Sequence, residues 1–243
     1  MPEIIPAILP KDYEDLKNKI AMVRGIAPMV QIDICDGVFV KTATWPFSSR
    51  AKSRDSDESF LGNNLDEHFE RIFKEQEGMP FWEDVDFELD LMVSDAVQNF
   101  YIYSKLGPKR MIFHVEAVGN LEEFKEWLEA VDPYVKDSIN IGVAINPSTP
   151  LENLFPLINC IDFVQCMGND EIGYHGVSLD EVVYEKIKIL REKYSDLPIA
   201  IDIGVNMNTA PLLVEAGATK LVAGSAIFNT NDIIGAIEEF KNL

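Results

Sequence analysis

Two short apolar segments of this chain each carry an aspartate where an apolar residue would be expected. Residues 31–35 read Gln-Ile-Asp-Ile-Cys, so strand alternation places Asp33 on the face opposite to the isoleucines. Asp202 is flanked by isoleucines in the same way and is followed closely by a Gly-Val-Asn turn signal. A buried carboxylate is costly unless another group pairs with it. Two such aspartates at strand ends therefore predict a catalytic pair.

A third acidic side chain and a histidine follow the same pattern. Asp90 shares a strand face with Glu88 and Met92, which makes it a third candidate carboxylate for the site. His114 shares a face with Glu116 in the next apolar segment. This shared face makes His114 a candidate rim residue of the site, and a lone histidine at such a position is more often structural than catalytic.

The elements that must position these side chains alternate between short apolar and longer amphipathic segments. This order is typical of repeated βα units, and the chain has eight of them. Strands are predicted at 3–9, 30–35, 86–92, 110–116, 139–145, 161–167, 198–203 and 220–224, and helices at 11–24, 64–77, 95–106, 119–131, 150–157, 179–194, 208–216 and 231–242. The prediction is a single (β/α)8 TIM barrel over residues 1–243, with its active site at the C-terminal ends of the strands.

One βα connection, at about residues 45–85, is longer than the others. Its segment 48–59 is polar and lacks apolar periodicity. Both a mobile excursion over the barrel mouth and a plain surface insertion fit this composition.

Composition limits the possible partners. The formal net charge of −20 argues against binding to nucleic acid or to an anionic membrane. A phosphorylated metabolite remains possible, because backbone amides bind phosphate without basic side chains. The N-terminal segment has no signal-peptide pattern, which predicts a cytoplasmic protein. The three cysteines are expected to be small buried thiols.

Seven segments, in order along nearly the whole chain outside residues 48–85, resemble the ribulose-phosphate 3-epimerase family. They are residues 5–9 (IPAIL), 33–40 (DICDGVFV), 90–93 (DLMV), 113–117 (FHVEA), 144–150 (AINPSTP), 201–206 (IDIGVN) and 222–228 (VAGSAIF). The resemblance implies a phosphosugar epimerase that inverts the carbon next to a ketone through an enediolate. Asp33 and Asp202 match the two aspartates that transfer the proton.

The chain departs from the family at the metal ligands. The family holds a divalent metal with two histidines and the two aspartates, whereas Gln31 and Asp90 occupy the histidine positions here. Gln31, Asp33, Asp90 and Asp202 would form an all-oxygen site that favours magnesium, manganese or calcium over zinc. The alternative is a site without metal, in which a protonated Asp90 donates a hydrogen bond to the intermediate. Ala7 and Cys35 are two further departures.

The resemblance also implies a phosphate end and a pocket lining. The residues that match are Gly204, Gly224 and Ser225 for backbone amides, Gly173, Tyr174, His175 and Gly176 for a glycine-rich lid, and Met92 and Met167 for the pocket wall. Turn geometry and core packing explain the same glycines and methionines. The implied ligand is a small phosphorylated sugar, and the implied assembly is a homo-oligomer.

Three functions follow from these observations. The leading hypothesis is a phosphosugar epimerase. A catalytically silent phosphosugar-binding or scaffold protein is the alternative, because the histidine ligands are missing. A related barrel decarboxylase or aldolase is a third reading, but such enzymes carry an Asp-x-Lys-x-x-Asp arrangement, and Cys35 stands where that lysine would be.

Overall fold

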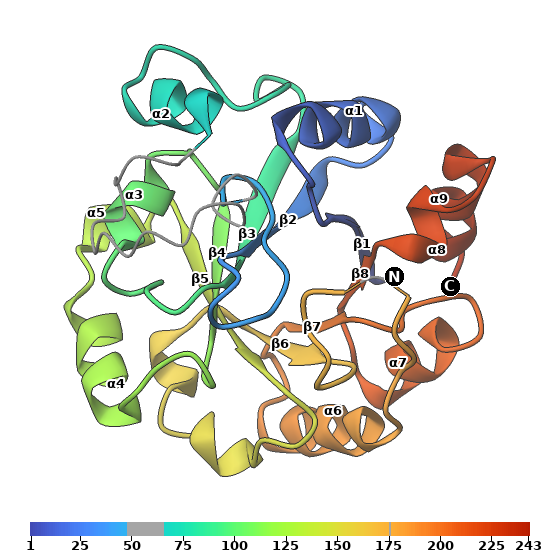
Figure 1. The fold of residues 1–243 in the computed structure, drawn as a ribbon. Coiled ribbons are helices and arrows are strands. Elements are labelled where there is room, and N and C mark those ends of the chain that lie inside the picture. The colour runs from blue at the N-terminus through green and yellow to red at the C-terminus, as the bar shows by residue number, and fades with distance from the viewer. Residues whose placement is uncertain (48–65, 175) are drawn as a thin grey trace.

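The eight strands close into a parallel barrel in which each strand pairs with its neighbours in sequence order. The computed structural model describes residues 1–47, 66–174 and 176–243, and Figure 1 shows the ring of strands surrounded by helices. The strands are β1 (Glu3–Ile8), β2 (Met29–Cys35), β3 (Asp86–Met92), β4 (Arg110–His114), β5 (Asn140–Ile145), β6 (Phe163–Met167), β7 (Ile199–Asp202) and β8 (Lys220–Ala223). The predicted barrel is confirmed.

Helices and short 3-10 turns form the outer layer. They are α1 (Tyr13–Val23), α2 (Glu67–Phe73), α3 (Phe100–Ser104), α4 (Leu121–Ala130), α5 (Pro133–Lys136), η2 (Leu151–Asn153), η3 (Ile158–Cys160), α6 (Val182–Lys193), α7 (Ala210–Ala216), α8 (Ser225–Phe228) and α9 (Ile233–Lys241). Several begin at a capping side chain: Asp12 accepts a hydrogen bond from the Asp15 amide, and Asn120 accepts one from the Glu122 amide.

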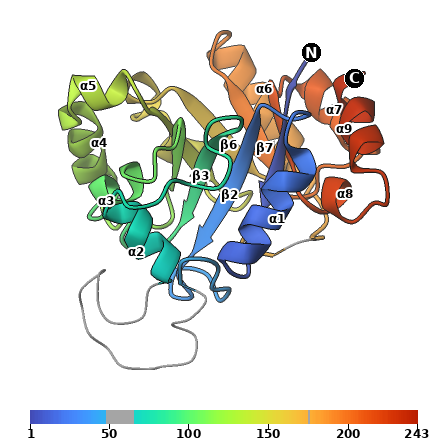
Figure 2. The same ribbon diagram turned by 90° about the horizontal axis from the view of Figure 1, so that it is seen from above.

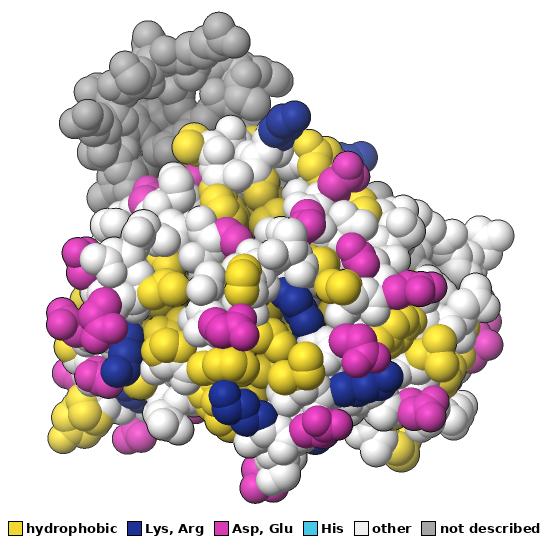
Figure 3. All heavy atoms as spheres, turned by 90° about the horizontal axis from the view of Figure 1, so that it is seen from below, with side chains coloured by type: hydrophobic (Ala, Val, Ile, Leu, Met, Phe, Trp, Pro, Cys, Tyr) yellow, Lys and Arg dark blue, Asp and Glu magenta, His cyan; other side chains and the backbone are white. Residues whose placement is uncertain are grey.

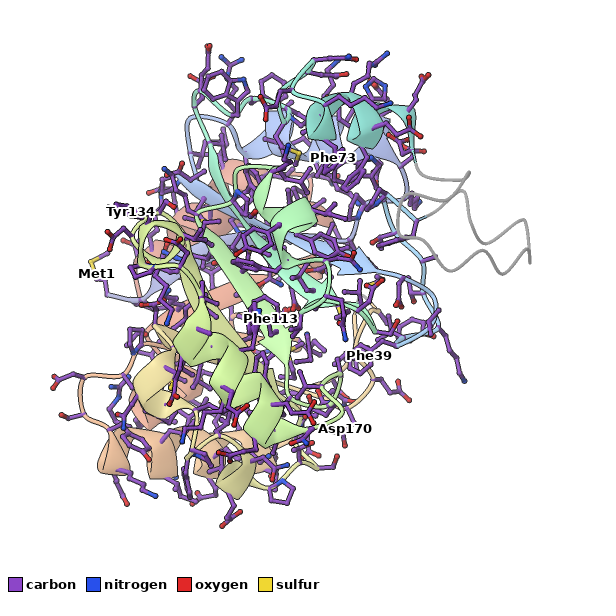
Figure 4. The ribbon with its side chains drawn as sticks, turned by 90° about the vertical axis from the view of Figure 1, so that its left-hand side faces the viewer. Met1, Phe39, Phe73, Phe113, Tyr134 and Asp170 are labelled. Carbon is purple, nitrogen blue, oxygen red and sulfur yellow. The ribbon has the colours of Figure 1, made fainter. Side chains whose placement is uncertain are left out.

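The two ends of the barrel differ in what they carry. Strands β2 and β3 run toward the end that faces the viewer in Figure 1, and both chain termini lie at the other end (Figure 2). Phe39 and Asp170 lie at the first end, whereas Met1 and Tyr134 lie at the second (Figure 4). The first end, which we call the mouth, therefore collects the loops that follow the strands.

Strand alternation produces two separate cores. Outward side chains pack under the helices: Phe113 of β4 meets Phe124 and Trp127 of α4 at centroid distances of 6.0 and 5.2 Å. Inward side chains fill the barrel, where the Phe163 ring lies so close to Gly142 that a β-carbon on that glycine would be 2.3 Å away. The interior of the barrel is therefore packed at this level.

Some predicted helices are shorter than expected or absent. No α-helix forms at 150–157; η2 and turns replace it, because Pro156 cannot donate a backbone hydrogen bond and its ring would clash with the preceding turn. The helix predicted at 95–106 is reduced to α3, and residues 95–99 form turns. Three short helices, α5, η3 and α8, were not predicted.

The predicted polar excursion at 48–59 lies outside the described residues. Among the described residues, no helix combines the length and the hydropathy that crossing a bilayer requires. Figure 3 shows acidic side chains spread among apolar ones on the face seen from below, with fewer basic side chains beside them. This distribution agrees with the strong negative net charge of the chain.

Candidate active site

Three buried aspartates converge inside the barrel near the mouth. Asp33 lies on β2, Asp90 on β3 and Asp202 on β7, and one carboxylate oxygen from each lies within 4.8 Å of the other two. Asp33 and Asp90 are direct register partners on adjacent strands. All three are at most 8% exposed. Strand pairing and barrel closure thus bring together residues that are far apart in the sequence.

An amide side chain bridges two of these carboxylates. Gln31 precedes Asp33 by two residues on β2, so both side chains point into the barrel. Its Nε2 donates to Asp33 Oδ1 at 2.8 Å and to Asp202 Oδ2 at 2.9 Å. Ala7, its register partner on β1, has no polar side chain to compete for these contacts. Gln31 therefore links the predicted catalytic pair directly.

The third aspartate has its own partners. Asp90 Oδ1 lies 2.8 Å from His114 Nε2, and Asp90 Oδ2 accepts a hydrogen bond from Gln165 Nε2 at 3.3 Å. Both partners are fully buried. The Phe39 ring lies against the His114 ring at a centroid distance of 5.7 Å. His114 is thus an ion-pair partner of Asp90 beneath the mouth.

Burial and mutual repulsion change the acidity of this cluster. Burial, followed by the charges of Asp202 and Asp90, holds the pKa of Asp33 well above its usual value. Burial and the charge of Asp90 raise the pKa of Asp202 to about 7. Burial alone would lower the pKa of His114, but the charge and hydrogen bond of Asp90 outweigh it and raise that pKa. The pair Asp33 and Asp202 therefore retains a proton near neutral pH.

The cavity at the mouth is lined by two of these aspartates and by the glycine-rich loops. Asp33 and Asp202 form part of its wall, together with most of the residues predicted to bind substrate. The lining residues are Ala7, Asp33, Met92, Met167, Gly173, Tyr174, Gly176, Val177, Asp202, Ile203, Gly204, Val205, Val222, Gly224 and Ser225. Gln31, Asp90 and His114 lie outside this lining and are fully buried.

A strained turn places backbone amides beside Asp202. Ile203 and Gly204 both have left-handed backbone angles, with φ of 72° and 75°. That conformation is rare for a β-branched residue and marks a position that the surrounding structure holds in place. A β-carbon at Gly204 would lie 2.6 Å from the Leu179 backbone nitrogen, so only glycine fits there. The same turn is stabilised by a hydrogen bond from the Ile203 amide to Asp202 Oδ1.

Sequence reasoning missed one buried polar residue of the site, and one predicted residue cannot be placed. Gln165 shares the inward face of β6 with Phe163 and Met167, so the alternation that identified Asp33 would also have found it. His175 of the predicted lid lies outside the described residues. The assignments of roles to the lining residues remain predictions.

The donor set at the three aspartates can hold a divalent metal ion. Three carboxylates whose oxygens lie within 4.8 Å of one another match the hard oxygen ligands of such ions. Gln31 could add its amide oxygen, although in this structure it turns its nitrogen toward Asp33 and Asp202. The site therefore fits a cation through its carboxylates.

Fold and site together define a (β/α)8-barrel enzyme with buried carboxylates at the C-terminal mouth. The model of the ribulose-phosphate 3 epimerase family matches residues 71–228. This match covers well over half of the chain, and the chain belongs to that family. The resemblance seen in the sequence is confirmed.

Named relatives extend the match to almost the full length. The chain is 28% identical to ribulose-phosphate 3-epimerase from Bacillus subtilis over 247 residues, covering 99% of each protein. It is 27% identical to the cytoplasmic isoform from Oryza sativa subsp. japonica, covering 98% of this chain and 93% of that one.

Solved structures support the fold at lower identity. KGPDC from Streptococcus mutans, in a complex with a phosphorylated sugar, superposes with a TM-score of 0.66 at 14% identity, covering 99% of this chain and 96% of that one. 3-Hexulose-6-phosphate synthase gives a TM-score of 0.61 at 16% identity, covering 100% of this chain and 99% of that one.

Proposed function

We propose that the protein is a phosphosugar 3-epimerase that acts on a ketopentose phosphate. The observation that carries this proposal is the convergence of Asp33 and Asp202 on one cavity, with a proton retained between them near neutral pH. Inversion at a carbon needs a base on one side and an acid on the other. Two carboxylates in different protonation states supply both functions.

The mechanism follows from the position of the two carboxyl groups on one cavity and from the need for one base and one acid. The ionised carboxylate, which we assign to Asp202 in one direction, takes the proton from the carbon next to the ketone and leaves a planar enediolate. Asp33, whose pKa burial and the charges of Asp202 and Asp90 hold well above its usual value, then delivers its proton to the opposite face of that carbon. In the reverse direction the roles exchange, so both aspartates are catalytic residues.

The rest of the cavity is assigned to substrate binding. Gly204, Gly224 and Ser225 offer backbone amides at the ends of β7 and β8, where barrels of this type bind phosphate. Gly173, Tyr174 and Gly176 cover the cavity, and Met92 and Met167 line it. The sugar-phosphate complex of KGPDC, a protein with the same fold, supports a small phosphosugar ligand. We assign no nucleic acid or membrane partner.

A divalent cation, if bound, would be held by Asp33, Asp90 and Asp202. This set contains only oxygen donors and favours magnesium, manganese or calcium over zinc. Such an ion would supply positive charge to an oxygen that becomes negative in the enediolate.

Incubation with ribulose 5-phosphate in deuterium oxide tests the proposal. We expect xylulose 5-phosphate to form and to carry deuterium at C3, because the returning proton exchanges with solvent. The assay is run on chelator-treated protein and after addition of Mg²⁺, Mn²⁺, Ca²⁺ or Zn²⁺. Ligand-induced thermal stabilisation without product or deuterium uptake in all conditions would instead support the silent binding protein.

A further inference from the structure

Gln31 makes two contacts that a structural core residue would not need. Its Nε2 donates one hydrogen bond to Asp33 Oδ1 and one to Asp202 Oδ2, at 2.8 and 2.9 Å. Its side chain is fully buried, and its Oε1 has no hydrogen-bond partner among the described residues. The amide therefore uses both hydrogens on the two carboxylates and leaves its oxygen unpaired.

Gln165 provides a matched comparison inside the same barrel. It is also fully buried, and its Oε1 likewise has no partner in the described part of the chain. Its Nε2 contacts one carboxylate oxygen, Asp90 Oδ2, at 3.3 Å, and the Met167 sulfur at 3.7 Å. The two glutamines thus have the same side chain and are equally buried. They differ because Gln31 bridges two carboxylates, whereas Gln165 contacts one.

We propose that Gln31 is a positioning residue for Asp33 and Asp202, and that its amide competes with a divalent cation for these two carboxylates. Two buried carboxylates repel each other, and an NH₂ group between them offsets this with one charge-assisted hydrogen bond to each. A divalent cation at this site would bind the same carboxylate oxygens of Asp33 and Asp202. To become a ligand, Gln31 would have to turn its amide over and lose both hydrogen bonds.

Two consequences follow for this chain. The carboxylate pair stays assembled without a cation, so the metal-free protein keeps the geometry that acid–base transfer needs. In addition, Gln31 lowers the affinity of the three aspartates for a cation instead of raising it. The first consequence rests on the proposed function; the second concerns binding alone.

Calorimetric titration with MnCl₂ tests the second consequence. The proteins are the wild type, Gln31→Leu, Gln31→Met and the control Gln165→Leu, each checked for folding by circular dichroism. We expect both Gln31 variants to bind Mn²⁺ about tenfold more tightly than the wild type, because the cation no longer displaces two hydrogen bonds to charged groups. Gln165→Leu should change the affinity less. Equal or weaker binding by the Gln31 variants would overturn the proposal and make Gln31 an ordinary ligand.

Epimerase kinetics test the first consequence. In chelator-treated protein, Gln31→Leu should lose about 10- to 100-fold in kcat with KM changed less than about threefold, since the substrate contacts remain and only the alignment of the pair is lost. Added Mn²⁺ should restore part of the loss in the variant and change the wild type little. A wild type that is active with Mn²⁺ and inactive without it would overturn this part. Failure of the proposed function is distinguishable, because it leaves every protein inactive while the Mn²⁺ titration still gives its answer.

Discussion

Charged side chains are buried at both ends of the barrel interior. At the end opposite the mouth, acidic and basic side chains pair with one another, whereas acidic side chains outnumber basic ones near the mouth. At the end opposite the mouth, Arg110 pairs with Glu88 at 3.0 Å and with Glu3 at 2.9 Å, and Lys220 lies 3.9 Å from Glu3. Lys220 also stacks over the Phe163 ring at 4.3 Å. Two acids thus meet two bases, and the cluster closes the base of the barrel.

Near the mouth, three aspartates face one histidine and two neutral amides. His114 pairs with Asp90, whereas Asp33 and Asp202 are bridged by the neutral amide of Gln31. An unbalanced group of buried acids lowers stability, so its presence indicates chemistry that needs a retained proton. From this comparison we infer that the charge-balanced cluster stabilises the fold and that the unbalanced cluster takes part in the proposed reaction.

Replacing an acid of the mouth should give the largest effect. Asp202→Asn removes one of the two proton-transfer groups and should lower kcat by about 10³-fold or more. Unfolding in urea should show no loss of stability, because the change also removes like-charge repulsion within the cluster. Asp33→Asn should lower kcat to a similar extent and should likewise leave the stability unchanged. A destabilised variant with near-normal kcat would reverse the assignment of the two clusters.

Breaking the balanced cluster should have the opposite effect. Arg110→Met leaves the buried Glu88 carboxylate without its partner and should lower the free energy of unfolding by about 3 kcal/mol. Activity per folded molecule should change little, because Arg110 lies at the far end of β4 from the cavity. Urea unfolding and kcat measured in parallel check both statements.

The pH profile sharpens the comparison further. Burial and the charge of Asp90 raise the pKa of Asp202 from 3.8 to about 7, so the base should lose activity as the pH falls through about 7. Burial, followed by the charges of Asp202 and Asp90, also holds the pKa of Asp33 well above its usual value, which favours its protonated form as the acid. The acidic limb of kcat/KM in chelator-treated protein should therefore lie near 7. A limb near 4 would show that the buried pair is ionised in the free enzyme.

The smallest effect is expected from Glu88, the acid of the balanced cluster. Burial raises its pKa from 4.5 to about 7 despite Arg110, so its folded form binds a proton more readily than the unfolded chain does. Stability from this group is complete below its unfolded pKa and declines as the pH rises through about 7. Glu88→Gln should flatten the pH dependence of unfolding over that range and leave the acidic limb of activity unchanged. An unchanged slope would contradict this.

Much of the site could be predicted because strand alternation is a local property. Asp33, Asp90 and Asp202 each interrupt an apolar segment, and the structure places all three inside the barrel. The same rule would have found Gln165. The helix predicted at 150–157 was wrong because Pro156 prevents the regular hydrogen bonding that the apolar spacing suggested.

The sequence by itself determined the eight strands of the barrel, the face of the strands that carries Asp33, Asp90 and Asp202, and the resemblance to the epimerase family. Only the tertiary structure decided how the inward polar groups pair: Gln31 with Asp33 and Asp202, and Asp90 with His114 and Gln165. The physical reason is that alternation is set by neighbours along one strand, whereas pairing depends on the stagger of strands around a closed barrel. That stagger joins Gln31 to Asp202 across 171 positions of sequence.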